Sequence, residues 1–521
     1  MSSTRRTFLH GMLRTAGVVT LAACSGTAPS ESSTDDDAAP APQLTASGPD
    51  PLPDSLQRRH FHVHNKRPLA LETRRSEMGV GVITPLSRFF VRNNLPRPSD
   101  SILDNRLAWT LRVSGVVRPG QIRLAELQQL GAETLTTVIQ CSGNGRAFFE
   151  HGPSGSSWAT GAAGCAMWTG VRVSDVLTHF GGPVEGAAFV TSTGGEPLPE
   201  GVDRDAVVVE RSIPLEKGLA DCFLVWEMNG EPLPLTHGGP LRLVVPGYYG
   251  CNQIKYIEHL AATTEQTTAK IQQSGYRFRP IGESGSPDQP SLWRMPVKSW
   301  LHGAGADDLA ILAGRRRLHG VALSGERGIR SVEYSVDCGV TWLAAELTGP
   351  DLGPNAWRTF LCEVDLPTGA TTVVTRATDM LGDVQPEARD ENERGYRHTG
   401  WRDHALTIQA VNELAAVTPS APTAVDAVPT AEPQAELSLS AQAERGKTVF
   451  TDTSSPSCGV CHTLADAGTQ GAVGPNLNAL APSVDQVQAA VSKGVGVMPA
   501  FDSLSPEQVA DVAAYVVEAT R

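Results

Sequence analysis

Near the C-terminus, the sequence Cys458-Gly459-Val460-Cys461-His462 places a histidine directly after a pair of cysteines. This spacing is the covalent attachment sequence of c-type haem, in which two thioethers hold the porphyrin and the histidine binds its iron. A CxxC pair alone is also compatible with a zinc site or a redox disulfide. The adjacent histidine favours haem, and a covalently held porphyrin constrains the fold strongly because the chain must close over a flat apolar ring.

The residues around this motif match a small class I cytochrome c. A helix is predicted over 443–450, and Gly474-Pro475-Asn476-Leu477 follows the motif. Met498 stands at the distance expected of the second iron ligand, which would raise the haem potential; core packing is the alternative. The sequence Ser505-Pro506-Glu507-Gln508 predicts the start of a helix with one apolar face, formed by Val509, Val512, Ala513 and Val516.

Another cysteine lies where a predicted strand ends. The run Thr137-Val138-Ile139 is β-branched and predicts a buried strand, and Cys141 follows at a Gly/Asn turn with Arg146 five residues on. A thiolate on a soft or high-valent metal, with a guanidinium nearby to hold an oxyanion, would need this arrangement. A buried structural cysteine beside a turn is the alternative.

Length and charge limit the class of protein. The chain has 521 residues, enough for roughly three domains. It is 40% hydrophobic and 19% charged, which is ordinary for a globular protein. The net charge of −13 argues against a nucleic-acid partner. The nine cysteines are too scattered to form an obvious disulfide framework, and two of them belong to the CxxCH motif.

The N-terminus has the features of an export signal. Arg5 and Arg6 precede a moderately apolar run, as in twin-arginine signals, which carry folded proteins. The sequence Leu21-Ala22-Ala23-Cys24 resembles a bacterial lipobox, in which Cys24 is lipid-modified; an ordinary signal peptide is the alternative. Residues 25–55 are rich in Ser, Thr, Asp, Ala and Pro and predict a solvated tether. We expect a periplasmic protein or a lipoprotein on the outer face of the cytoplasmic membrane.

Five segments together resemble the sulfite oxidase family of molybdenum enzymes. They occur in the family's order, and the resemblance covers about residues 60–410. They are Phe-Val-Arg-Asn-Asn-Leu-Pro at 90–96, Gln-Cys-Ser-Gly-Asn-Gly-Arg at 140–146, Arg-Ser-Ile-Pro-Leu-Glu-Lys at 211–217, Glu-Met-Asn-Gly-Glu-Pro-Leu at 227–233 and His-Gly-Gly-Pro-Leu-Arg-Leu-Val-Val-Pro-Gly at 237–247. The resemblance implies a molybdenum held by the dithiolene of one pterin, with Cys141 as the only protein ligand.

The resemblance also implies roles for other residues. Arg92 and Arg146 would bind the oxyanion substrate, because fixed guanidiniums offer planar, permanently charged donors; Arg92 could equally be a surface residue. Tyr276 matches the active-site tyrosine, and Arg394 matches an arginine that the following domain returns to the site. Trp168 matches an aromatic residue of the substrate pocket, with core packing as the alternative. The residues that match positions holding the pterin and its phosphate, where surface ion pairs would look the same, are His237, Arg242 and Lys255.

Two departures from the family pattern affect the substrate. Asn94 stands where many sulfite-oxidising members carry histidine, and Gly145 replaces one of a pair of basic residues. Both features, with Cys165 before Trp168, also occur in the sulfane dehydrogenase catalytic subunit of the bacterial sulfur-oxidation system. The resemblance implies a sulfite dehydrogenase that passes electrons through its own haem to an external cytochrome. The alternatives are a sulfane-sulfur dehydrogenase, a reductase of the same family, or a tethered electron carrier with a degenerate molybdenum domain.

The sequence predicts a multidomain α+β chain. The predicted order is a signal (1–24), a tether (25–55), a mixed α/β molybdopterin domain (56–280), an immunoglobulin-like β-sandwich (281–410), a linker (411–436) and a small all-α cytochrome c domain (437–521). The resemblance implies that the β-sandwich forms a homodimer. Alternating His60, His62 and His64 would share one strand face, but such histidines are more often solvated or hydrogen-bonded than metal-bound.

Overall fold

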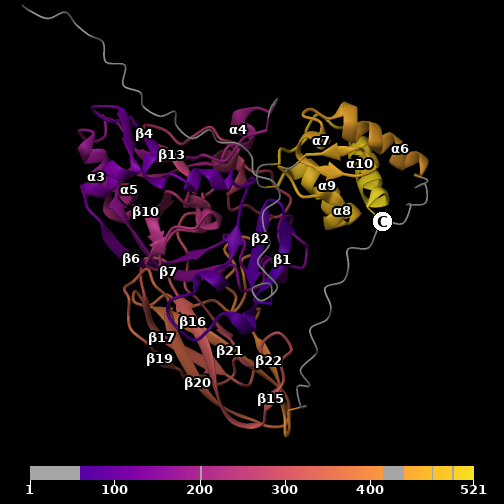
Figure 1. Cartoon of the computed structure of the whole chain (residues 1–521). Coiled ribbons are helices and arrows are strands. Elements are labelled where there is room, and N and C mark those ends of the chain that lie inside the picture. The colour runs from indigo at the N-terminus through magenta and orange to yellow at the C-terminus, as the bar shows by residue number, and fades with distance from the viewer. Residues whose placement is uncertain (1–58, 200–201, 415–438, 472, 496–497, 521) are drawn as a thin grey trace, which may run out of the picture. The chain divides into compact units, whose positions relative to one another are not determined.

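The computed structural model describes residues 59–199, 202–414, 439–471, 473–495 and 498–520 (Figure 1). The predicted signal, the tether, Cys24 and most of the predicted linker lie outside the described residues. In the parts of the chain that are described, no helix is both long and apolar enough to cross a membrane.

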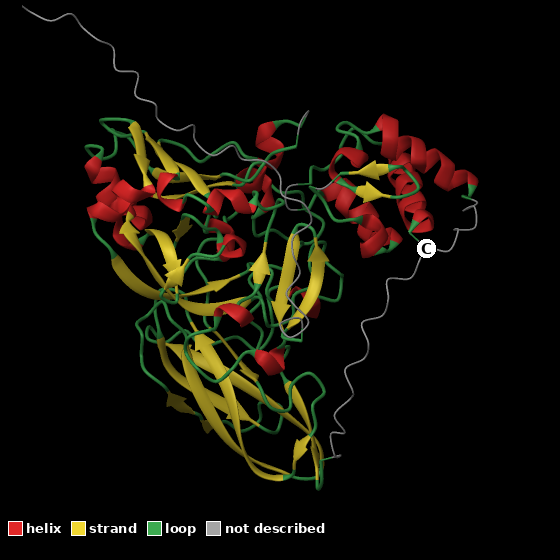
Figure 2. Ribbon diagram, in the orientation of Figure 1, coloured by secondary structure: helices red, strands yellow, loops and turns green. Residues whose placement is uncertain are grey.

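The first domain is built mainly of antiparallel strands, with short helices at their ends (Figure 2). A three-stranded sheet has the order β1-β2-β3: β1 (Phe61–Lys66), β2 (Leu69–Thr73) and β3 (Val91–Arg92). A five-stranded sheet has the order β11-β10-β7-β6, with β12 also paired to β10: β6 (Glu133–Gln140), β7 (Ala163–Arg172), β10 (Phe223–Met228), β11 (Glu231–Pro232) and β12 (Arg242–Val244). The strand predicted before Cys141 is therefore β6, in the register that pairs Gln140 with Ala163.

A second five-stranded sheet has the order β5-β4-β13-β8-β9, and only its β4–β13 pair is parallel. Its strands are β4 (Thr110–Ser114), β5 (Gly120–Arg123), β8 (Phe189–Gly194), β9 (Glu210–Pro214) and β13 (Ile257–Thr263). The α-helices of this domain are α2 (Leu124–Leu127), α3 (Val173–His179), α4 (Arg204–Val207) and α5 (Leu215–Asp221).

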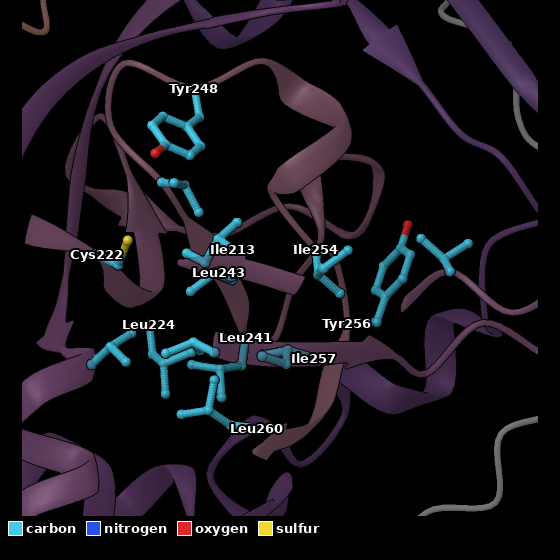
Figure 3. Close-up of a cluster of buried hydrophobic side chains, with 14 of the residues drawn as sticks. Ile213, Cys222, Leu224, Leu241, Leu243, Tyr248, Ile254, Tyr256, Ile257 and Leu260 are labelled. Carbon is cyan, nitrogen blue, oxygen red and sulfur yellow. The ribbon is translucent and has the colours of Figure 1, made fainter. Parts of the chain in front are cut away.

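The main core of this domain takes side chains from both five-stranded sheets. Figure 3 shows Leu224 of β10 and Leu243 of β12 next to Ile213 of β9 and Leu260 of β13. A smaller cluster, which includes Phe89, Ile139 and Trp168, packs against Cys141. Burying this apolar surface fixes the ends of β3, β6 and β12, the strands that carry the predicted site residues.

Residues 298–411 form two sheets that share one core. One sheet has the order β14-β16-β20-β19: β14 (Lys298–His302), β16 (Gly314–Leu323), β19 (Glu346–Thr348) and β20 (Arg358–Leu366). The other has the order β15-β22-β21-β17-β18: β15 (Ile311–Leu312), β17 (Ile329–Ser335), β18 (Leu343–Ala344), β21 (Gly369–Asp379) and β22 (Leu406–Val411). Alternating residues of these strands fill the space between the sheets, as a β-sandwich requires. The immunoglobulin-like topology stays a prediction.

The last domain is mostly helical. Its α-helices are α6 (Ala441–Thr448), α7 (Cys458–Cys461), α8 (Leu477–Leu480), α9 (Val484–Lys493) and α10 (Pro506–Ala519). The sequence signal for α10 is matched in detail, because Ser505 caps the helix and Val512, Ala513 and Val516 are buried. The domain is not purely α-helical as predicted, since the short strands β23 (Thr463–Leu464) and β24 (Thr469–Gln470) pair after the haem motif.

Candidate active site and haem site

The segment after β6 is a tight turn that presents Cys141. The Cys141 N–H donates to the Ala162 carbonyl oxygen (2.9 Å), and the Cys141 carbonyl accepts from Asn144 N (3.0 Å). The Asn144 side chain ties the turn to its neighbours: its Nδ2 donates to Gln140 Oε1 (3.1 Å) and Thr160 O (3.2 Å), and its Oδ1 accepts from Ala162 N (3.1 Å). The thiol is therefore held on a rigid loop at the end of a buried strand.

Gly145 allows this turn to pack against the next domain. Its φ is 110°, and a Cβ there would lie 2.3 Å from Cγ of His398. Arg146 is 6% exposed and holds two carbonyls, with Nε donating to Arg394 O (2.9 Å) and Nη1 to Ser156 O (2.8 Å). Burial lowers the pKa of Arg146, but a guanidinium stays charged at neutral pH. Arg146 therefore uses two of its N–H donors to hold the loop that carries Cys141.

One pocket brings Cys141 together with predicted residues from distant parts of the chain. Its wall includes Arg92 at the end of β3, Asn94, Cys141 and Tyr276. The Tyr276 hydroxyl donates to Asn94 Oδ1 (3.2 Å). Burial raises the pKa of Tyr276, so its phenol keeps its proton and remains a donor. Asn94, the departure noted in the sequence, thus orients the predicted active-site tyrosine.

The same pocket also carries the residues predicted to hold a pterin. His237, Arg242 and Lys255 all line the pocket. Burial lowers the pKa of His237 well below its usual value, so its imidazole is neutral, and it lowers the pKa of Arg242 to about 10, so this side chain stays charged. Arg242 Nη1 donates to His237 O (2.7 Å), and Lys255 Nζ donates to Asn93 Oδ1 (2.7 Å).

The polar atoms of the pocket wall fit a cofactor with hydrogen-bonding edges. Glu196 Oε2, Arg242 Nε and Gln253 Oε1 belong to residues that line the pocket, and they are buried without a hydrogen-bond partner. Buried polar atoms are almost always paired, so these atoms are available to a group bound in the pocket. A pterin offers ring N–H groups and carbonyl oxygens for this purpose, and the Cys141 thiolate offers the metal ligand. The residues present therefore fit a molybdenum–pterin cofactor.

Three predicted residues lie outside the pocket wall: Arg146, Trp168 and Arg394 are not among the described residues that line it. Trp168 is fully buried, stands edge-on to Phe89 (6.2 Å between ring centroids) and lies under the Arg242 guanidinium (5.0 Å). It packs behind the wall, as the core-packing alternative states. Arg394 lies in the loop between β21 and β22, and its backbone carbonyl accepts from Arg146 Nε.

The alternating histidines do not assemble a metal site. His60 Nδ1 lies 2.7 Å from Glu77 Oε2, and His64 Nε2 lies 2.6 Å from Glu72 Oε2. Among the described residues, no group of three or more His, Cys, Asp or Glu side chains is placed to hold a metal ion. These histidines act as hydrogen-bonding residues at the start of the first sheet.

The C-terminal domain positions its motif for haem. Cys458, Cys461, His462 and Met498 line one cavity, and neither cysteine forms a disulfide. His462 Nδ1 lies 2.9 Å from the Pro475 carbonyl oxygen, which can only accept, so Nε2 keeps the lone pair that binds iron. A Cβ at Gly474 would lie 2.4 Å from Cε1 of His462, so glycine is required where the predicted Gly-Pro-Asn-Leu segment begins.

Sequence reasoning missed several pocket residues. Glu196 and Gln253 belong to the wall, as does Cys251. Burial raises the pKa of Glu196 to about 8, although Lys255 opposes the shift. An acidic residue directly after Gly194 and Gly195, at the end of β8, was the available signal. Gln253 and Cys251 had no such signal, because their surroundings are ordinary in sequence.

Three family models match the chain. The oxidoreductase molybdopterin binding domain matches residues 97–271, the Mo-co oxidoreductase dimerisation domain matches residues 289–411, and the model described as cytochrome c oxidase, cbb3-type, subunit III matches residues 441–516. These matches follow the predicted order of domains.

Relatives and solved structures agree with these models. Mitochondrial sulfite oxidase from Mus musculus is 31% identical over 392 residues, covering 71% of this chain and 69% of the relative. The Rattus norvegicus enzyme is 32% identical over 397 residues, with the same coverage of 71% and 69%. The sulfane dehydrogenase SoxCD from Paracoccus pantotrophus shares the fold, with a TM-score of 0.56 at 24% identity, over 73% of this chain and 98% of that chain.

The predicted cofactors, a molybdenum–pterin group and a c-type haem, are therefore confirmed by the matched domains. The enzyme class is confirmed as well, since the catalytic domain is that of a molybdopterin oxidoreductase. The chain belongs to the sulfite oxidase family of molybdenum enzymes and ends in a cytochrome c domain.

Proposed function

We propose that this protein is a sulfite dehydrogenase. Sulfite and water give sulfate, two protons and two electrons, and the electrons leave one at a time through the chain's own haem to an external cytochrome. The observation that supports this most directly is the pocket that joins Cys141, Arg92 and the Tyr276–Asn94 pair, on a chain that also carries a haem site.

The side chains of the pocket have separable tasks. Arg92 supplies permanently charged donors that bind and orient the sulfur oxyanion. Tyr276 stays protonated and, fixed by Asn94, presents its hydroxyl at the same pocket. Arg146 holds the Cys141 loop in place through its two carbonyl partners. The molybdenum cofactor, when bound at Cys141, supplies the two-electron oxidation.

Stopped-flow mixing of the oxidised protein with sulfite tests this function. We expect reduction of the haem band, and we expect the Cys141→Ser variant to lose it while keeping its haem. If molybdenum-loaded protein shows no haem reduction with sulfite but responds to a sulfane-sulfur donor, the sulfane dehydrogenase alternative replaces the proposal. A reductase would instead oxidise a pre-reduced haem when its acceptor is added.

We also infer where the protein resides and how it assembles. The N-terminal sequence supports twin-arginine export and a lipid anchor at Cys24 facing the periplasm. A Cys24→Ala variant should then move from the membrane fraction to the soluble fraction.

The dimerisation model at 289–411 supports a homodimer, and so do exposed apolar side chains on the same domain, with Val340 80% and Leu381 72% exposed. Light scattering of the purified protein measures its molar mass, which should be twice that of one chain.

A further inference from the structure

Arg211 is a buried cation beside the active-site pocket. It lies in β9 and its side chain is fully buried. Its Nη1 donates to the Ile271 carbonyl (2.8 Å), and its Nη2 donates to Asn252 Oδ1 (3.0 Å). Across the described part of the chain, no carboxylate lies within ion-pair distance of this guanidinium, so its partners are neutral.

The surroundings keep this charge uncompensated. The Asn252 side-chain amide cannot flip, because its Nδ2 already donates to Tyr249 O (3.1 Å) and Leu292 O (2.8 Å). The ionisable acids close enough to influence the cation are Cys251, Tyr276 and Tyr396. Burial raises the pKa of Cys251 to about 11, and it also raises the pKa of Tyr276, so these two are neutral at pH 7. Burying an unpaired charge is costly, and this site is built to hold one.

The cation lies directly against the predicted active-site tyrosine. The Arg211 guanidinium carbon is 5.6 Å from the centroid of the Tyr276 ring. The Ile271 carbonyl that Arg211 binds also accepts the Tyr276 N–H (3.3 Å), so both residues hold the start of the same turn, Ile271–Gly275. Tyr276 in turn lines the pocket with Cys141 and Arg92.

We propose that Arg211 is a positioning residue that supplies a fixed positive potential behind Tyr276 and thereby strengthens the binding of divalent oxyanions in the Cys141 pocket. The inference deepens the proposed function, on which it rests for the nature of the ligand. Its physical signature is that a Coulomb interaction scales with the charge of the ligand, whereas a loss caused by disturbed packing does not.

Calorimetric titration of the oxidised, full-length holoprotein tests this signature. The probes are sulfate and methanesulfonate, which have similar shapes but carry two charges and one. For Arg211→Gln we expect affinity for methanesulfonate to fall about tenfold and affinity for sulfate about a hundredfold, as for one unit charge at roughly 10 Å in a medium of effective dielectric constant about 20. Arg211→Lys keeps the charge and should lose less than about threefold for either anion.

Arg277→Gln is the matched control. Arg277 is also buried, and it bonds to the same turn through Nε to Gln272 O (2.9 Å), with further bonds to Gln289 O and Gln266 Oε1. Its guanidinium is a second buried charge near Arg211, so its loss should lower both affinities, but by smaller factors than the loss of Arg211. Equal losses for the two anions in Arg211→Gln, or equal losses in the Lys and Gln variants, would overturn the proposal.

Two further outcomes are distinguishable. If Arg211→Gln does not fold, Asn252→Asp places a carboxylate on the guanidinium, at the cost of two amide hydrogen bonds, and should weaken sulfate more than methanesulfonate. The inference would also be wrong if the wild-type protein bound no sulfate. Charge-dependent sulfate binding without sulfite oxidation would instead refute the proposed function and leave the inference standing.

Discussion

Replacing Lys298 by methionine should stabilise the protein at neutral pH, and this gain should shrink or reverse at alkaline pH. Lys298 begins β14, is 1% exposed, and its Nζ donates to the Asn144 carbonyl (3.0 Å) in the Cys141 loop. Asp403, the acid that influences its charge, is already paired with His398 and Arg389. Burial lowers the pKa of Lys298 to about 7, and Asp403 opposes this shift only in part.

The magnitude follows from this pKa. A lysine pKa that falls from 10.5 to about 7 costs the folded state about 5 kcal/mol wherever the ammonium is charged in both states, at about 1.4 kcal/mol per pKa unit. Between pH 7 and 10.5 the unfolded chain binds the proton and the folded chain does not, so stability rises with pH through this window. Methionine removes that dependence, but it leaves the buried Asn144 carbonyl without its donor, a loss of about 1–3 kcal/mol.

We therefore expect Lys298→Met to be more stable than wild type at pH 7, and the difference to shrink or reverse by pH 10. Calorimetry of the unfolding transition that includes β14, at several pH values, measures this as a change of a few degrees in Tm. Lys217→Met is the control: Lys217 is also buried but pairs with Asp221 (2.7 Å) and Glu326 (2.6 Å), so its loss should destabilise at every pH. Tm values for Lys298→Met that stay parallel to wild type across this range would refute the reasoning.

Three further outcomes follow from the two sites. Arg92→Met should raise KM for sulfite roughly 10- to 100-fold, because a charged hydrogen bond is worth about 1.5–3 kcal/mol; steady-state kinetics at matched molybdenum content checks this, and an unchanged KM would contradict it. Met498→Leu should keep the haem attached but lower its midpoint potential, as a redox titration would show; a potential equal to wild type would remove Met498 as an iron ligand. Cys461→Ala should weaken haem staining on a denaturing gel, and full staining would mean that the second thioether is not formed.

Much of the site could be predicted because its signals are local. The Cys-Gly-Val-Cys-His motif fixes two attachment points and one iron ligand within five consecutive residues, so no tertiary information is needed. The strand before Cys141 and the helix after Ser505 were also predictable, because β-branched residues and a capping box act within a few neighbours. The order of the domains followed from motifs of the same kind.

Only the tertiary structure shows which polar groups share a pocket and which residues merely support that pocket from behind. Asn94 meets Tyr276 across a separation of 182 residues, and the orphaned atoms of Glu196 and Gln253 become visible only when the wall is assembled. Trp168 was predicted to line the pocket, but in the structure it is fully buried and is not among the described residues that line it. The physical reason is that burial and long-range hydrogen bonds depend on packing between strands distant in sequence, whereas motifs record only what a residue's immediate neighbours require.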